Sequence, residues 1–424
     1  LMRGMTLQQA TSLAVEFVLA CIDATARDPQ AGWYGVDFER ALPFLCDAVR
    51  KLQELLNKKG FDCGAVDGIF GSKTYAAVMA FQNANGLAAD GIVGKVLGVT
   101  TADGSFSYHG EALSQTQVLG AYEDKLESVY ACNIPTPAQS METFSYEATQ
   151  RKAPAVKVAK PKVLIPAFPG TNCEYDSAKA VRDAGAEPEI IVINNLSADG
   201  IARSVERFAN ELKTAQMVFI PGGFSGGDEP DGSGKFITAF FRNAAVKEGV
   251  TALLEQRDGL MCGICNGFQA LIKLGLVPYG KIIDTDETCP TLTFNNISRH
   301  QSRIVRTRVA SNKSPWLALT NVGDVYNVPI SHGEGKFLAT EELVKQLAAN
   351  GQIATQYVDL DGNATADVHF NPNGSLYAIE GITSPDGRVF GKMGHSERIG
   401  SGLYKNVPGE YNIRMFEAAV KYFR

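Results

Sequence analysis

The sequence is poor in cysteine, and its few cysteines are far apart. Eight occur in 424 residues, at positions 21, 46, 63, 132, 173, 262, 265 and 289. This spacing excludes a disulfide-dense secreted scaffold, and no CxxC pair recurs at the spacing of a zinc site. The single CxxC runs from Cys262 to Cys265. We therefore expect a reduced, cytoplasmic setting and no structural metal.

Long apolar runs and a strong excess of one charge are also absent. No stretch approaches the roughly 18 apolar residues that cross a bilayer, and the formal net charge is only -6 at pH 7. The N-terminal stretch TLQQATSLAVEFVLACIDATARD mixes polar with apolar residues and does not have the form of a signal peptide. Neither a nucleic acid nor a membrane is therefore expected as the main partner.

The length predicts more than one domain. A chain of 424 residues is too long for one ordinary domain, so two or three are expected. Residues 1–45 form the first segment. Apolar residues recur there at spacings of three and four from Leu7 to Cys21, which predicts a helix with one apolar face. No chemistry is indicated for this segment, and a packing role is the simplest interpretation.

Residues 46–104 contain two helical runs and a repeated turn. The turn VDGIFG at Val66–Gly71 returns as ADGIVG at Ala89–Gly94. In each turn the aspartate can accept hydrogen bonds from nearby amides, and the glycine tolerates a positive φ. The first helix is expected to end at Gly60 and the second to be capped by Ser72. A small helical bundle is predicted.

Residues 105–160 change in character along their length. Two short strands are expected first, followed by a helix from about Leu113 to Tyr130. The stretch from Asn133 to Lys162 combines prolines with lysines and arginines and shows no sustained periodicity. It is predicted to be a linker between domains that share no core.

Residues 161–424 alternate between apolar strands and amphipathic helices. The strands are KVLIPAF, EIIVIN, MVFIPGG and GLMCGIC, and two of the intervening helices are expected to end at Gly185 and Gly275. Strands joined through helices imply a parallel sheet that is covered on both faces. The predicted fold class is α/β, with the small helical bundle added at the N-terminus.

The first chemical motif is Gly263–Gly267, which places Cys265 between an apolar strand and a helix. A nucleophile flanked by small residues at such a sharp turn is typical of the nucleophile elbow. A cysteine at a helix N-terminus is also favoured as the thiolate. The competing interpretation is a redox CxxC pair with Cys262. The position of Cys262 inside the apolar strand, with its side chain on the opposite face, favours the elbow.

A second motif offers a base and a partner for it. His395 and Glu397 are two residues apart, so on an extended segment they point the same way. The histidine can take a thiol proton, and the carboxylate can orient the imidazole. His332 and Glu334 have the same spacing. Glycines flank them, which favours a turn at the substrate entrance or at an interface rather than a base.

A glycine pair follows another strand. Gly222 and Gly223 come directly after MVFIP. Consecutive glycines at a strand end let backbone amides turn toward a developing oxyanion. An ordinary glycine turn is the alternative for this motif when it is considered alone.

Together the motifs resemble one family. PGTNCEYD, PGGFS, CGICNGFQ, SHGEG and GHSER are similar to the class I glutamine amidotransferase domain of phosphoribosylformylglycinamidine synthases, most strongly of the large single-chain form. The resemblance spans roughly 162–424. The segment from FSYHGEALSQ to LESVY resembles the last stretch of the synthetase part of those enzymes. Residues 46–97 resemble the peptidoglycan-binding type 1 module, although the chain departs from that pattern after Gly94.

The resemblance implies a flavodoxin-like fold and a set of roles for particular residues. The implied catalytic triad is Cys265, His395 and Glu397. Backbone amides near Gly223 and Asn266 would stabilise the oxyanion, and Gln269 would contact the substrate glutamine. Many relatives have proline where Ser396 stands. That departure leaves the neighbouring His and Glu roles unchanged.

The implied reaction is glutamine hydrolysis, which needs no cofactor or metal. Its ammonia would serve the ATP-dependent conversion of formylglycinamide ribonucleotide to formylglycinamidine ribonucleotide in purine biosynthesis. ATP and Mg would act only in the synthetase part, which is expected to be largely missing here and supplied by a partner domain or subunit. One alternative is a cell-wall-associated protein that binds peptidoglycan through residues 46–97. Another is a cysteine peptidase or stress-response hydrolase of the same fold.

Overall fold

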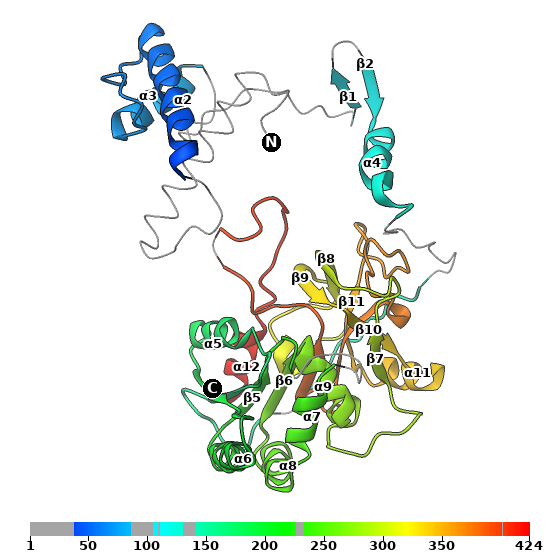
Figure 1. The fold of residues 1–424 in the computed structure, drawn as a ribbon. Helices are drawn as coiled ribbons and strands as arrows, with labels where there is room; N and C mark the ends of the chain where they lie inside the picture. The colour runs from blue at the N-terminus through cyan, green and yellow to red at the C-terminus, as the bar shows by residue number, and fades with distance from the viewer. Residues whose placement is uncertain are drawn as a thin grey trace. The chain divides into compact units, whose positions relative to one another are not determined.

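The chain divides into two compact units, Leu1–Val118 and Leu119–Arg424, and each is described by itself (Figure 1). The computed structural model describes residues 38–85, 105–108, 111–129, 141–151, 153–225, 233–400 and 402–424. The helix expected from Leu7 to Cys21 and the second turn at Ala89–Gly94 lie outside these residues. Within the described ranges, no helix combines the length and the apolar character that a membrane span requires.

Two helices build the core of the first unit. They are α2 (Phe38–Lys58) and α3 (Ser72–Ala84), and they bury an apolar cluster that consists of Leu52, Leu56, Cys63, Ala77 and Val78. Gly60 follows α2 with a φ of 84°, as the helix-end prediction requires. The prediction for Ser72 is wrong. Gly71 is the N-cap of α3, and Ser72 is already helical.

The turn between these helices is held by one buried amide side chain. Gln53 Nε2 donates to Asp67 Oδ1 at 2.9 Å and to the Ile69 carbonyl at 3.1 Å. Its Oε1 accepts from the Gly68 amide at 2.9 Å. Gly68 has a φ of 79°, which explains the Asp-Gly pair of the turn. A buried side chain that bonds both members of this pair and the residue after it fixes the turn by hydrogen bonds.

A hairpin and a helix follow. Strands β1 (Ser105–Tyr108) and β2 (Glu111–Ser114) pair antiparallel. Helix α4 (Gln115–Glu123) comes next, then the short η1 (Asp124–Leu126). The order of two strands and a helix agrees with the prediction, but the helix is shorter than expected. It begins at Gln115, because Leu113 is paired in the hairpin, and it ends at Glu123.

One nine-stranded sheet organises the C-terminal unit, in the order β4-β3-β5-β6-β13-β12-β11-β8-β9. Its strands are β3 (Lys162–Ala167), β4 (Glu187–Val192), β5 (Met217–Ile220), β6 (Leu260–Ile264), β8 (Gln301–Val309), β9 (Val325–His332), β11 (Ile353–Tyr357), β12 (Ile379–Thr383) and β13 (Val389–Lys392). Strands β7 (Thr291–Phe294) and β10 (Glu334–Leu338) form a separate antiparallel pair.

The first five strands of that order are mutually parallel. Counted along the chain, these strands lie in the sheet in the order second, first, third, fourth, followed by β13 as the fifth parallel strand. This is the flavodoxin-like order. The predicted α/β class is therefore confirmed. The remaining strands are antiparallel, which the prediction of a parallel sheet did not include. Connections such as the one from Thr383 to Val389 are too short for a parallel crossover, so they form hairpins.

Helices cover both faces of the parallel part. The helices of this unit are α5 (Glu174–Asp183), α6 (Ala198–Leu212), α7 (Lys235–Phe241), α8 (Ala244–Thr251), η2 (Ala252–Gln256), α9 (Asn266–Leu274), α10 (Leu276–Tyr279), η3 (Pro315–Leu317), α11 (Glu341–Ala349), η4 (Leu376–Ala378) and α12 (Met415–Phe423). Right-handed crossovers place α5 on one face and α6 and α8 on the other, because the chain reverses its direction across the sheet after β4. Helix α12 packs beside α5 (Figure 1).

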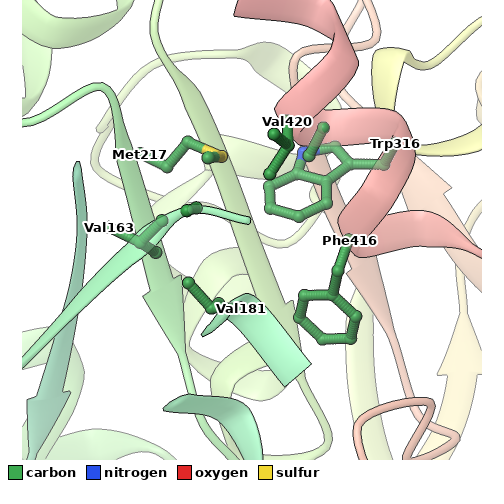
Figure 2. Close-up of a pocket in the computed structure, with 8 residues that line it drawn as sticks. Val163, Val181, Met217, Trp316, Phe416 and Val420 are labelled. Atoms are coloured by element: carbon green, nitrogen blue, oxygen red, sulfur yellow. The ribbon is translucent and has the colours of Figure 1, made fainter. Parts of the chain in front are cut away.

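The core between the sheet and α12 is apolar and almost fully packed. Phe219 lies between Trp316 and Phe416, with ring centroids 6.4 and 5.3 Å away. A void of about 10 Å³ remains there, lined only by apolar side chains such as Val163 and Met217 (Figure 2). A space this small without polar partners holds neither a ligand nor a stable water. It is a feature of core packing.

The stretch before the first sheet strand is part of this unit. Phe144 is buried in the main core, and its carbonyl accepts a 2.6 Å hydrogen bond from Arg308 Nη1. Tyr146 forms a β-bridge with Ser311, and the Val158 amide donates to the Phe423 carbonyl at 2.8 Å. The linker prediction is therefore wrong from residue 141 onward. The division into four ranges as a whole stays a prediction.

Candidate active site

Cys265 occupies a strained turn between β6 and α9. Its φ of 53° and ψ of -107° lie in a region that side-chain-bearing residues rarely adopt. The flanking glycines permit this turn. A Cβ on Gly263 would lie 2.6 Å from the Gly267 carbonyl carbon, and one on Gly267 would lie 2.1 Å from the Ile220 oxygen. The pattern read as a nucleophile elbow thus has the strain and the close packing of that motif.

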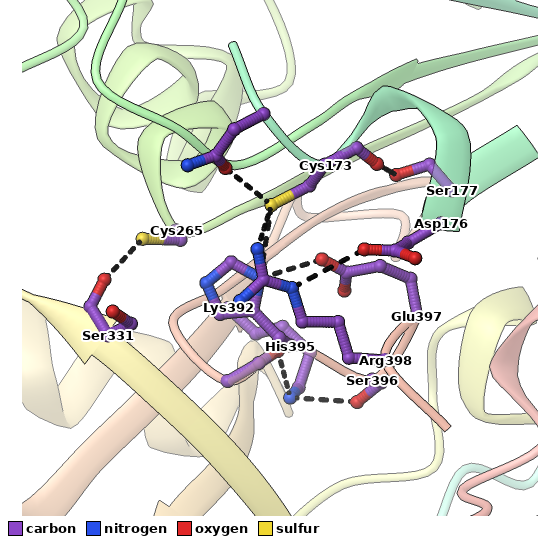
Figure 3. A network of polar contacts seen from close by, with 12 residues as sticks. Cys173, Asp176, Ser177, Cys265, Ser331, Lys392, His395, Ser396, Glu397 and Arg398 are labelled. Atoms are coloured by element: carbon purple, nitrogen blue, oxygen red, sulfur yellow. Dashed lines mark hydrogen bonds and ion pairs between the residues drawn. The ribbon is translucent and has the colours of Figure 1, made fainter. Parts of the chain in front are cut away.

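The thiol of Cys265 is buried at the N-terminus of α9. Only 4% of the residue is exposed. Its amide donates to the Lys392 carbonyl at 2.9 Å, and its Sγ lies 3.7 Å from the Ser331 carbonyl oxygen (Figure 3). Cys265 directly precedes the first residue of α9, so its side chain lies at the N-terminal end of that helix.

His395 and Glu397 form a buried pair on the segment after β13. His395 Nδ1 lies 2.6 Å from Glu397 Oε1 (Figure 3). Burial alone lowers the pKa of His395, but the Glu397 carboxylate, with contacts to Cys173 and Cys265, raises that pKa well above its usual value. For Glu397, burial opposes ionisation, yet the charge and hydrogen bond of His395 lower its pKa. Each partner thus favours the charged form of the other.

Gly222 is the point where the two motifs meet. A Cβ at this position would lie 2.6 Å from His395 Cε1, 3.3 Å from Cys173 Sγ and 3.4 Å from Cys265 Cβ. The tertiary structure thus brings Cys265 and His395 against the same glycine. Only glycine leaves room for both side chains there.

Two backbone amides are candidates for the predicted oxyanion role. Gly223 pairs with Thr171 in an antiparallel bridge whose hydrogen bonds run from Asn172 to Gly222 and from Phe224 to Gly170. In this pattern the Gly223 amide has no partner in the bridge. Asn266 is the first residue of α9, and first-turn amides have no partner within their helix. Both positions suit the predicted oxyanion role, which stays a prediction.

The side chains of Asn266 and Gln269 belong to one buried network. Asn266 Oδ1 accepts from Ser225 Oγ at 2.6 Å, and Asn266 Nδ2 donates to Gln269 Oε1 at 2.9 Å. Gln269 Nε2 donates to the Glu334 carbonyl at 2.5 Å. Gln269 therefore supports the turn between β9 and β10. Its predicted contact with substrate stays a prediction.

Sequence reasoning missed Cys173 and Arg398. Cys173 Sγ lies 3.7 Å from His395 Nδ1 and accepts a 3.0 Å hydrogen bond from Arg398 Nη2 (Figure 3). Arg398 also pairs with Asp176 at 3.6 Å. Cys173 stands in PGTNCEYD after the first strand, so its place at the carboxyl end of the sheet was a usable signal.

The charges around Cys173, His395 and Glu397 disfavour a bound metal ion. In the part of the chain that the structure describes, the donor atoms of Cys173, His395 and Glu397 form a group that lies within 4.8 Å of one another. The Arg398 guanidinium, 3.0 Å from the sulfur, repels a cation there. His395 Nδ1 is also already bonded to Glu397. That the site uses no metal stays a prediction.

His332 does not copy the arrangement of His395. It is 1% exposed, and its Nδ1 lies 3.2 Å from Asn295 Oδ1. Burial, together with the nearby His395 and His300, lowers the pKa of His332 to about 3. Glu334 accepts from the Ser233 amide instead, at 3.0 Å. A neutral imidazole without a carboxylate partner is a poor alternative to the His395 pair.

Cys262 lies within β6 and is fully buried. Burial raises the pKa of its thiol well above the usual value. A reactive cysteine has a lowered pKa and some exposure. The redox interpretation of the CxxC pair therefore loses its support.

Comparison with known proteins agrees with this geometry. The sequence model of the CobB/CobQ-like glutamine amidotransferase domain matches residues 160–423, and that of the peptidoglycan binding domain matches 47–97. Among curated relatives, the phosphoribosylformylglycinamidine synthase subunit PurQ of Methanococcus maripaludis is 33% identical over 284 residues, which cover 62% of this chain and 97% of that protein. PurQ of Dehalococcoides mccartyi is 34% identical over 274 residues, 63% of this chain and 99% of that protein.

Solved structures also match part of the chain. The PurLQS structure from Thermotoga maritima contains a chain that is matched over 62% of this chain and 100% of its own length, with a TM-score of 0.45 and 23% identity. The glutaminase domain of Trypanosoma brucei CTPS with bound acivicin is matched over 62% and 94%, with a TM-score of 0.36 and 11% identity. The family model covers more than half of the sequence, at residues 160–423. The chain therefore belongs to the glutamine amidotransferases, the enzymes that take ammonia from the side chain of glutamine.

Proposed function

We propose that the chain hydrolyses glutamine to glutamate and ammonia, with Cys265 as nucleophile, His395 as base and Glu397 as its partner. The observation that supports this best is the meeting of the two motifs at Gly222. A strained, buried cysteine at a helix N-terminus and a buried imidazole–carboxylate pair border the same glycine. This is the arrangement that activates a thiol for attack on a carbonyl.

The first half of the reaction forms a thioester. The Cys265 thiolate attacks the side-chain amide carbon of glutamine, and the carbonyl oxygen becomes an oxyanion. Amides at Gly223 and Asn266 would stabilise this charge, at about 3 kcal/mol for each donor. The protonated His395 then gives its proton to the nitrogen, and ammonia leaves as the C–N bond breaks. Glu397 holds the imidazolium in place throughout.

The second half releases glutamate. His395, now neutral, takes a proton from water as the oxygen attacks the thioester carbon. The C–S bond breaks, and Cys265 leaves as the thiolate, so that the thiolate–imidazolium pair is restored. None of these steps requires a nucleotide or a metal. The Glu397 carboxylate lies 2.6 Å from Nδ1 of the ring that moves these protons.

We further propose that the ammonia serves the conversion of formylglycinamide ribonucleotide to formylglycinamidine ribonucleotide in purine biosynthesis. The curated relatives that match residues of this domain are named as subunits of phosphoribosylformylglycinamidine synthase. A synthetase domain or subunit would then be the partner, and it would bring the ATP and Mg of the second reaction. The cytoplasmic setting expected from the sequence fits this role and stays a prediction.

A reconstitution experiment tests both parts of the proposal. The chain is mixed with a synthetase that has lost its own glutaminase domain, and amidation is measured with glutamine as the nitrogen source. We expect glutamine-dependent amidation that is lost with Cys265→Ala. Free ammonia should support amidation with either form, which shows that the synthetase is intact. Glutamine hydrolysis without any amidation would refute the purine role and leave the glutaminase intact.

Peptidoglycan binding is not favoured as the main function. The match to that binding domain covers residues 47–97 only, whereas the amidotransferase match covers 160–423. The apolar side chains around Leu52, Leu56 and Val78 are used in the core of the small bundle. A pull-down of the whole chain with purified peptidoglycan tests the alternative. Retention that survives Cys265→Ala would show a separate binding activity.

A further inference from the structure

Lys392, the last residue of β13, contacts both halves of the catalytic site. Its carbonyl accepts the Cys265 amide at 2.9 Å. Its side chain is completely buried and runs along the segment that carries His395 (Figure 3). The ammonium donates to the Gly394 carbonyl at 2.9 Å and to Ser396 Oγ at 3.1 Å. One residue therefore joins the backbone of the nucleophile to both neighbours of the base.

Glu380 on β12 completes this arrangement. Its Oε1 lies 3.1 Å from Lys392 Nζ and accepts the Gly394 amide at 2.6 Å. Its Oε2 accepts from Thr355 Oγ1. Both charged side chains have no exposed surface. Gly394 is thus held at its amide by Glu380 and at its carbonyl by Lys392.

Stability alone does not account for a pair of this kind. A fully buried ion pair loses its hydration, and well-packed apolar residues in its place often stabilise a protein as much or more. Here the hydrogen bonds of the pair go to Gly394 and Ser396, on either side of His395. The His395 amide is bound separately, to the Pro329 carbonyl at 2.9 Å. Gly394, His395 and Ser396 are thus each held by at least one of these hydrogen bonds.

We propose that Lys392 and Glu380 are a positioning pair that sets His395 against Cys265 for the glutaminase reaction. The proposal rests on the proposed function, because it assigns the pair to that same site. Both side chains are fully buried, so contact with the substrate is not expected. The pair holds residues 394 and 396, on either side of His395. It affects the reaction by setting the position of the imidazole. A displacement of about 1 Å at such a site is enough to lower the rate by about 10²-fold.

The test separates positioning from stability by comparing single and double variants. Lys392→Met and Glu380→Gln each leave a buried partner unsatisfied, so both should lower the thermal midpoint and kcat. The double variant Lys392→Met/Glu380→Gln removes both charges. We expect it to regain most of the thermal midpoint but to keep a kcat for glutamine hydrolysis about 10 to 100 times below that of the unchanged chain. KM should change little, because substrate contacts are intact.

A second readout follows the thiolate itself. The rate of Cys265 alkylation by iodoacetamide is measured against pH in each variant. A displaced imidazolium stabilises the thiolate less, so the midpoint of the profile should move to higher pH in the double variant. Arg388→Met is the matched control. It removes another buried cation, one residue before β13 and beside Asp386, and should lower the thermal midpoint without changing kcat or the alkylation profile.

The outcomes are distinct. A folded double variant with the kcat and alkylation profile of the unchanged chain overturns the proposal. If the variants at Lys392 do not fold, Ser396→Ala decides, because it removes one hydrogen bond of the ammonium and leaves the ion pair. It should lower kcat without lowering the thermal midpoint comparably, and an unchanged kcat would count against positioning. An unchanged chain that neither hydrolyses glutamine nor reacts with a glutamine-like chloroketone refutes the proposed function instead.

Discussion

His395 Nδ1 and Glu397 Oε1 are 2.6 Å apart in a site where each residue is 3% exposed. Their contact holds the imidazole in one orientation and keeps its positive charge in a buried place. Cys173 and Arg398 border the same pair. The histidine is therefore part of a small charged network rather than an isolated base.

The two cysteines of the CxxC pair should behave differently. Cys265→Ala should lower glutamine hydrolysis by about 10⁴-fold or more, because it removes the nucleophile. Cys262→Ala should retain most of the activity and cost about 1–3 kcal/mol of the free energy of unfolding, as expected for a small change in the core. Steady-state kinetics and denaturant unfolding measure these effects. Equal loss of activity in two folded variants would restore the redox interpretation.

The two His-x-Glu motifs should separate in a labelling experiment. His332→Asn should spare the covalent labelling of Cys265 by a glutamine-like chloroketone, since the pKa of His332 is about 3 and it is neutral in the working range. His395→Asn should abolish labelling at neutral pH. Mass spectrometry of the labelled peptide identifies the modified cysteine. The opposite pattern would show that the roles of the two histidines are reversed.

The buried pair predicts a pH window for stability. The pKa of His395 is raised by folding, so its contribution is complete below the ordinary value of 6.5 and is lost as pH rises through the folded value. The pKa of Glu397 is lowered, so its contribution is complete above 4.5 and is lost as pH falls through the folded value. The stability lost in Glu397→Gln should therefore be largest between pH 4.5 and 6.5. Denaturant titrations across pH measure it, and a loss that grows steadily above this window would contradict the pairing.

Gly222 should tolerate no side chain. In Gly222→Ala the new Cβ would lie 2.6 Å from His395 Cε1, so the imidazole must move and kcat should fall by about 10²-fold. Gly249→Ala is the matched control. Gly249 lies on α8, and its Cβ would meet Leu212 Cδ1 of α6 at 2.8 Å. Both changes should cost stability, but only the first should lower kcat. A Gly222→Ala enzyme of normal kcat would show that the convergence at this glycine is not catalytic.

The segment before β3 should be needed for a stable domain. Phe144→Ala should cost about 3 kcal/mol of the free energy of unfolding, because it empties a site in the main core. Exposed Val156 serves as the control, and Val156→Ala should change stability little. Limited proteolysis should spare residues 141–151, whose backbone is bound to the sheet. Early cleavage inside that stretch, with the domain still folded, would revive the linker prediction.

Much of the site was readable from the sequence, because local patterns carried it. A strand, a small-residue turn and a helix around Cys265 describe an elbow without any knowledge of distant residues. The spacing of His395 and Glu397 is likewise local, since two residues on an extended segment face the same side. The alternation of strands and helices predicted the α/β class for the same reason.

The tertiary structure decided what depends on contacts between distant segments. Gly222, Cys173 and Cys265 come from three separate strand ends, and only the order of strands in the sheet brings them together. Other features also join residues that no periodicity links. They are the antiparallel pairing of β12 with β13, the burial of Phe144 in the main core and the ion pair of Lys392 with Glu380. A sequence pattern reports which way a side chain faces within its own element. Its partner in the core is set by packing between elements, because burial and hydrogen bonding must be satisfied across the whole sheet at once.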